Sequence, residues 1–189
     1  MTIQNLKLNT EDKKFLLELA REAIEAKLES REVRIPETIP ENLQEKRGAF
    51  VTLTIDGKLR GCIGHLLPTQ ALYQDVIENA RAAAFDDPRF APLTADEFQR
   101  IKIEISALDL PQKFASKSPQ DLLNFLAKNR PGVILKKGQH RATFLPQVWE
   151  DLPEPAEFLS HLCLKAGLPP DEWARGVEIE TYRVTRLGS

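Results

Sequence analysis

The chain has 189 residues, an ordinary globular composition and charges that nearly cancel: 26 Lys and Arg against 28 Asp and Glu leave a net charge of −2. That balance excludes the strong basic bias of a general nucleic-acid binder, although it does not exclude a local basic patch. Two cysteines are too few for a disulfide framework, no apolar run approaches a membrane span, and the first residues lack the features of a signal peptide. We therefore expect a soluble, cytoplasmic protein of one domain, undivided or built of two lobes.

A helix is predicted near the start of the chain. Thr10 suits the N-cap because its hydroxyl can accept a backbone N–H, and the acidic residues after it suit the positive end of the helix dipole. Apolar residues then recur at helical spacing as far as Leu28, which gives one stripe that can face a core. Two Ile-Pro pairs break this pattern, so residues 31–47 are predicted as an extended connection.

A β-hairpin follows, with strands at 49–55 and 58–64 on either side of Asp56-Gly57. A three-residue loop, with its glycine left-handed, pairs Leu53 with Leu59 and separates apolar from polar side chains. The polar face would then carry Thr52, Thr54, Arg60 and Cys62. A two-residue loop would mix apolar and charged side chains on both faces, so the longer loop is favoured.

The rest of the chain alternates between helices and strands. A helix is predicted from Thr69 to just before Asp86, and a capping box at Thr94–Glu97 predicts a short helix. Residues 101–108 alternate between apolar and polar, as in a half-buried strand. The later elements are a helix from Ser118 to about Lys128, a hairpin of 132–137 with 140–145, a helix from Pro155 to Ala166, and a last strand at 177–184. The predicted class is α+β, with a mainly antiparallel sheet and flanking helices.

The most unusual stretch is Leu59-Arg60-Gly61-Cys62-Ile63-Gly64. Two glycines inside a strand usually mark a bulge, or a close approach by backbone or ligand. Cys62 lies two residues from the Arg60 guanidinium, and a nearby cation favours the nucleophilic thiolate. On these residues alone the other interpretation is favoured, in which Cys62 is a small buried hydrophobe and the glycines let a helix pack closely.

This stretch resembles the signature of the AMMECR-type domain family, whose prokaryotic members are called protein A of the AmmeMemoRadiSam system. Other matching segments run in order along the chain: Gly48–Leu53, Val76–Ala80, Ala83–Phe90, Pro92–Leu93, Ile103–Ser106, Thr143–Trp149 and Lys165–Pro169. The resemblance implies a single domain over residues 1–189, with two lobes and a cleft beside the Arg-Gly-Cys strand. It also implies association with a Memo-like protein and a radical S-adenosylmethionine (SAM) protein, but it implies no reaction.

Arg60 is a candidate for ligand binding, and three more polar residues in the matching segments are candidates in addition to it. Glu104 lies on the polar face of its strand and is expected to face Arg60; an exposed ion pair there would be worth only about 0.2–1 kcal/mol. Arg89 either holds a carboxylate or phosphate or ties down its own loop. Pro146 suits a first helical position, so the amides around Gln147 either bind an anion or simply begin a helix.

No metal or cofactor is expected. Cys62-x-x-His65 has the spacing of half a zinc site, but His161 and Cys163 point apart on their helix and cannot complete it. The chain also lacks a phosphate-binding loop, a dinucleotide fingerprint and the cysteines of an iron–sulfur cluster.

Both tryptophans, Trp149 and Trp173, are predicted to contribute to core or interlobe packing.

Three functions are weighed. The preferred one is a binding or accessory protein that takes a small molecule, a peptide or a partner protein, because Glu104 is the only evident proton acceptor on the Cys62 side. The runner-up is an enzyme or enzyme subunit with Cys62 as its catalytic nucleophile. An RNA-binding module is disfavoured by the negative net charge and by the single aromatic residue, Phe50, near the polar face.

Overall fold

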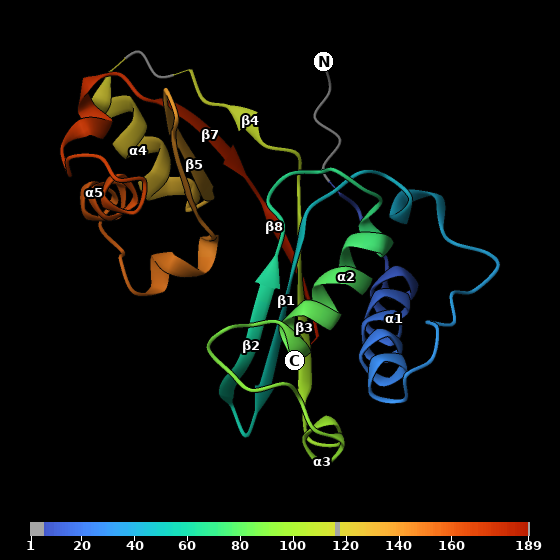
Figure 1. Cartoon of the computed structure of the whole chain (residues 1–189). Helices are drawn as coiled ribbons and strands as arrows, with labels where there is room; N and C mark the ends of the chain where they lie inside the picture. The colour runs from blue at the N-terminus through green and yellow to red at the C-terminus, as the bar shows by residue number, and fades with distance from the viewer. Residues whose placement is uncertain (1–5, 116–117, 189) are drawn as a thin grey trace. The chain divides into compact units, whose positions relative to one another are not determined.

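A computed structural model describes residues 6–115 and 118–188 and divides the chain into two compact units. Unit 1 comprises Met1–Asp109 with Thr185–Ser189, and unit 2 comprises Leu110–Val184. Each unit has its own four-stranded sheet with helices against it (Figure 1). The predicted α+β class with antiparallel sheets and flanking helices is confirmed.

The sheet of unit 1 has the order β2 (Lys58–Gly64), β1 (Ala49–Ile55), β3 (Lys102–Leu108) and β8 (Val184–Leu187). Helix α2 (Leu72–Phe85) packs on β1 and β2, while α1 (Thr10–Leu28) packs on α2 and β3. A short helix, α3 (Ala95–Phe98), precedes β3. The core between the helices and the sheet includes Leu16, Ala20, Ile24, Val51, Leu53, Val76, Ala80 and Ile105.

The sheet of unit 2 has the order β4 (Gln112–Lys113), β7 (Glu178–Tyr182), β5 (Gly132–Lys137) and β6 (His140–Phe144). Its helices are α4 (Pro119–Asn129) and α5 (Pro155–Lys165). Short 3₁₀ turns occupy Glu41–Leu43 in unit 1, and Pro146–Glu150 and Glu172–Arg175 in unit 2. Trp149 is buried and stacks on Phe158 with 3.7 Å between ring centroids, and its indole N–H donates to the carbonyl of Pro131 at 2.8 Å. Its predicted packing role is confirmed.

Two predicted helix starts need correction. Asn9 caps α1 in place of Thr10, because a capping box needs an acid three residues later: the Asn9 side chain accepts the Asp12 N–H at 2.8 Å, and the Asp12 carboxylate accepts the Asn9 N–H at 2.9 Å. Helix α2 begins at Leu72 and not at Thr69. The Gln70 carbonyl accepts the Arg47 N–H at 3.2 Å and the Leu72 N–H donates to the Glu45 carbonyl at 2.9 Å, so these two groups are not available for helical bonds.

The last predicted strand, 177–184, is two strands in different sheets. Residues of β7 pair with β5 in unit 2, whereas β8 lies next to β3 in unit 1. The predicted strand covers β7 but only the first residue of β8, because the alternation of apolar and polar residues fails at Thr181 and Tyr182 and does not mark a second strand. The two-residue strand β4 was not predicted, because two residues carry no readable period.

The loop of the first hairpin has two residues, which corrects the predicted three. Ile55 pairs with Lys58, and both Asp56 (φ 51°) and Gly57 (φ 76°) are left-handed, as a type I′ turn requires. A β-bulge then shifts the register, so that Leu53 pairs with Gly61 and not with Leu59. The bulge restores the separation of faces that a regular two-residue hairpin would have lost, and it leaves Leu59 45% exposed.

Gly61 brings β2 close to helix α2. A Cβ atom on this residue would clash with the carbonyl oxygen of Ala83, which belongs to the helix backbone and cannot move away cheaply. This contact agrees with the interpretation in which the glycines of the motif permit close helix packing. It also shows that the neighbouring residue, Cys62, points to the opposite face of the sheet.

We expect Gly61→Ala to lower the free energy of unfolding by about 1–3 kcal/mol, because the new methyl group must push α2 away from the sheet. Urea unfolding monitored by circular dichroism measures the change. Gly57→Asn is the control, since no atom lies near its would-be Cβ and asparagine tolerates a left-handed turn. Equal stability of the Gly61→Ala variant and the wild type would contradict the close packing.

Candidate functional site

A row of three polar side chains crosses the sheet of unit 1. Thr52 in the central strand β1 pairs with Cys62 of β2 on one side and with Glu104 of β3 on the other. Their neighbours Val51 and Leu53 are fully buried on the α2 side, so the row lies on the other face. We call this row, with Arg89 at its edge, the Cys62 face.

Cys62 is held by three neighbours. The Thr52 hydroxyl donates to its sulfur at 3.3 Å, and its own backbone N–H donates to an Asp87 carboxylate oxygen at 2.9 Å. The Arg89 guanidinium donates to its carbonyl at 3.4 Å. Because β2 is an edge strand, the Asp87 bond satisfies an N–H that no strand pairs. The thiol itself is partly exposed.

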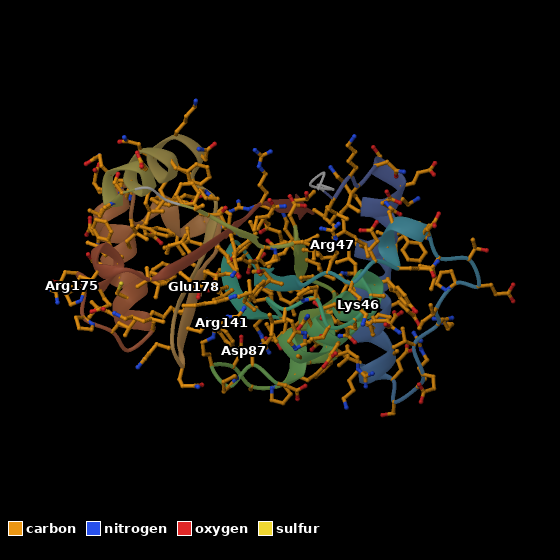
Figure 2. The ribbon with its side chains drawn as sticks, turned by 90° about the horizontal axis from the view of Figure 1, so that it is seen from above. Lys46, Arg47, Asp87, Arg141, Arg175 and Glu178 are labelled. Carbon is orange, nitrogen blue, oxygen red and sulfur yellow. The ribbon has the colours of Figure 1, made fainter. Side chains whose placement is uncertain are left out.

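Asp87 is the buried centre of this edge, on the loop that follows α2 (Figure 2). Its two carboxylate oxygens accept from the guanidinium of Arg89 at 2.9 and 2.7 Å, and one also accepts the Arg89 backbone N–H at 3.1 Å. These bonds, with that from the Cys62 N–H, hold the pKa of Asp87 well below its usual range. Arg89 ties down its own loop, which is one of the two roles considered from the sequence, and its side chain remains 54% exposed.

The arginine that contacts Cys62 is Arg89, through the Cys62 carbonyl. The pKa of Arg89 is raised mainly by the Asp87 carboxylate, with a small contribution from Cys62. The expectation that Arg60 would supply this charge came from spacing along the strand, which placed the two side chains on one face. Arg60 is instead the additional residue at the bulge, between the pairs Leu53–Gly61 and Thr54–Leu59.

Arg60 pairs with Glu97 of helix α3, where Glu104 was expected. Its guanidinium donates to both Glu97 oxygens at 2.8 and 3.0 Å and to the carbonyl of Ala91 at 2.9 Å. The Arg60 side chain is 12% exposed and lies over the ring of Phe90. Hydrogen bonds from Arg60, and then from the backbone of Thr94, lower the pKa of Glu97 to about 2. The sequence did not suggest Glu97 as the partner of Arg60, because the Glu97 carboxylate already had a role in the predicted capping box with Thr94.

Chemically, the arrangement gives the Cys62 sulfur a hydrogen-bond donor but no base. The Thr52 hydroxyl donates to Sγ, whereas the Arg89 guanidinium donates to the backbone carbonyl. Within residues 6–115 and 118–188, however, no imidazole or carboxylate is hydrogen-bonded to Cys62 Sγ, and Thr52 is not basic at neutral pH. The residues placed together are Thr52, Cys62, Asp87, Arg89 and Glu104.

His65 takes part in a separate buried network that sequence reasoning set aside. Its Nδ1 atom lies 2.8 Å from a carboxylate oxygen of Asp75, a fully buried residue of α2. Asp75 also accepts the Ala49 N–H at 2.8 Å and the Asn79 amide at 3.0 Å. The sequence did contain a signal of this network, because Asp75 and Asn79 are two polar residues four apart in the otherwise apolar stripe of α2. His65 lies with α2, so its side chain diverges from that of Cys62.

Gln147, the last predicted site residue, belongs to unit 2 and is half-buried in the turn Pro146–Glu150. Pro146 does occupy the first helical position, as expected. The neighbouring Val148 N–H donates to the Leu145 carbonyl at 3.1 Å, so it is not available to an anion in the way that we expected.

Within residues 6–115 and 118–188, none of the helices has both the length and the apolar character needed to cross a bilayer. The same ranges contain no group of three His, Cys, Asp or Glu side chains placed to bind one metal ion.

The Arg60–Glu97 pair should make stability depend on acid pH. Because the pKa of folded Glu97 is lowered from 4.5 to about 2, its contribution is complete above about pH 4.5 and is lost as the pH falls towards 2. We expect Arg60→Gln to cost about 1–3 kcal/mol at pH 7, and the difference from wild type to shrink below pH 4.5. Urea unfolding at several pH values measures it. Arg100→Gln, which breaks an exposed pair with Asp56, is the control and should change little. A cost that does not vary with pH would contradict the assignment.

Comparisons with known proteins identify the family. The family model AMMECR1 matches residues 17–187. A protein of Nanoarchaeum equitans is 41% identical over 160 residues, which cover 84% of this chain and 89% of that protein. A protein of Methanopyrus kandleri is 44% identical over 176 residues, covering 88% and 83%. The crystal structure of an uncharacterized protein from Pyrococcus horikoshii has a TM-score of 0.84 and 35% identity, covering 95% of this chain and 92% of that one. This chain therefore belongs to the AMMECR1 family.

Proposed function

We propose that this protein is a binding or accessory protein that uses the Cys62 face to recognise a partner or ligand. The partners we propose are a Memo-like protein and a radical SAM protein, as the family resemblance implies. A cytoplasmic location fits the two free cysteines, Cys62 and Cys163.

One observation carries the choice of binding over catalysis. Both arginines near Cys62 are already bound to the protein's own carboxylates, Arg60 to Glu97 and Arg89 to Asp87, in each case through two hydrogen bonds. A catalytic thiol usually relies on a cation or a base that is free to respond as charge develops. Here the guanidinium groups serve first to hold the loop of residues 86–97 at the edge of β2.

The Cys62 face offers the chemistry of a recognition surface. It combines a hydroxyl, a thiol and a carboxylate in one row, and the exposed guanidinium of Arg89 stands at its edge. Such a mixture of donors and acceptors can specify a polar peptide segment or a small polar molecule. The strands keep these groups in fixed positions, which lowers the entropic cost of binding.

The second candidate is an enzyme or enzyme subunit in which Cys62 is the nucleophile. The Thr52 hydroxyl, 3.3 Å from the Cys62 sulfur, and the Arg89 guanidinium, 3.4 Å from the Cys62 carbonyl, are the observations that favour it. In this case a substrate or partner would have to supply the proton acceptor.

Alkylation by iodoacetamide separates the two candidates. If Cys62 serves binding, it should react no faster than the thiol of an unstructured peptide, and Arg89→Gln should change its rate less than about threefold. Cys163 should be protected, because it is fully buried and burial raises the pKa of its thiol. Mass spectrometry of the modified peptides gives both rates. A Cys62 rate at least a hundredfold above the peptide thiol, and lost in Arg89→Gln, would establish the nucleophile instead.

Partner binding can be tested with one charge reversal on the Cys62 face. We expect Glu104→Lys to weaken binding to the Memo-like or radical SAM protein of the same genome by at least tenfold, because it places an unmatched charge in the contact. Isothermal titration calorimetry measures the affinity. Glu37→Lys makes the same change of charge at an exposed loop residue and should bind as the wild type does. Equal binding by all three proteins, or binding by none, would reject the proposed partner surface.

A further inference from the structure

We propose that unit 1 has a second ligand site, separate from the Cys62 face, that binds a small aliphatic carboxylate through Arg81. The site is a pocket of about 500 Å³ along the outer side of helix α2. We call it the α2 pocket and define it by Lys27, Ile35, Ile77, Glu78, Arg81 and Phe85. Its volume lies in the range of small-molecule sites.

The α2 pocket has an apolar lining on two sides. Ile77 and Phe85 lie eight residues apart on α2 and so share one stripe of the helix. Ile35 comes from the connection after α1, and it keeps 46% of its surface exposed, which is high for a large apolar residue. These three side chains can cover the hydrocarbon part of a ligand.

Arg81 stands midway along this stripe, half-buried and without an ion pair or a hydrogen bond from its guanidinium. This sets it apart within the described residues of unit 1, where each other arginine has a partner. Those with partners are Arg21, Arg31, Arg34, Arg47, Arg60, Arg89, Arg100 and Arg186. A half-buried guanidinium that the fold leaves unpaired, and that lines a pocket, is suited to an external anion.

The structure also shows why Arg81 is left without a partner. Glu78 lies three residues before it on α2, a spacing that commonly gives an ion pair. The Glu78 carboxylate instead accepts the Gln70 amide at 2.6 Å. Gln70 is anchored in turn, because the same nitrogen donates to the fully buried Asp75 at 3.0 Å. The fold thus holds the nearest acid of the helix away from Arg81.

The other charges of the pocket favour a ligand with a single negative charge. Lys27, at the end of α1, adds a second cation that has no ion-pair partner in the described residues. Asp86, at the end of α2, adds an exposed carboxylate, which would repel a second anionic group at that end. One carboxylate would pair with Arg81 and be attracted by Lys27, and an uncharged tail towards Phe85 would bring no second anion near Asp86. Four helical residues separate Arg81 from Phe85, about 6 Å, which matches a tail of about five carbons.

Hexanoate and hexanamide are the probes, because they share the tail and differ in charge. In an NMR titration of the full chain, we expect hexanoate to give saturable shifts in α2 and to bind at least tenfold more tightly than hexanamide. Arg81→Gln should remove this preference and leave hexanamide binding unchanged. Arg100→Gln removes the same charge from another arginine of unit 1 and should bind hexanoate as the wild type does.

Three outcomes would overturn the proposal: no saturable hexanoate binding to a wild type that is folded, equal binding of both probes, or equal losses in Arg81→Gln and Arg100→Gln. A peptide that ends in leucine tests the source of the carboxylate, and we expect it to bind at least tenfold more weakly than hexanoate. Tighter binding of the peptide would overturn the assignment to a small molecule. Because Arg81 has no partner to lose, its variant should unfold at the wild-type temperature.

Discussion

The carboxylate of Asp87 is the interaction on which the candidate site depends. It is buried at the edge of the sheet of unit 1, where it accepts the unpaired N–H of Cys62 and both arms of the Arg89 guanidinium. A buried carboxylate is tolerated only when its lone pairs are satisfied, and these donors satisfy them. These bonds fix the loop that follows α2 against β2 at Cys62, and they thereby help to position the Cys62 thiol.

The two ligand sites that we propose differ in whether their arginines are already paired with carboxylates of the protein. Near Cys62, Arg60 is paired with Glu97 and Arg89 with Asp87. That surface therefore presents the Cys62 thiol and the exposed part of the Arg89 guanidinium. In the α2 pocket the reverse holds: Glu78 is bound by Gln70, and Arg81 is left unpaired. An ion pair inside the protein and an ion pair with a ligand compete for the same group. Which arginine is already occupied therefore decides what each surface can bind.

Much of the fold could be read from local patterns. The strands of the first hairpin, 49–55 and 58–64, have the predicted bounds, and the capping box of Thr94 with Glu97 is present. Cys62 and Glu104 do share a face, as alternation predicts. The partner of Arg60 was wrong, because a single bulge moved that side chain out of the alternating pattern. The start of α2 was wrong because residues distant in the chain already bind its backbone.

The sequence by itself determined features that depend on residues two to four apart: the helix stripes, the capping box of Thr94 with Glu97, the bounds of the first hairpin, and the shared face of Thr52 and Cys62. These depend on backbone geometry, which repeats at short and regular intervals. Only the tertiary structure decided the partners of the charged side chains. Arg60 meets Glu97 from 37 residues away, and Cys62 meets Asp87 from 25 residues away. Such pairs form where loops and strand edges come together, and no local period of the sequence records that meeting.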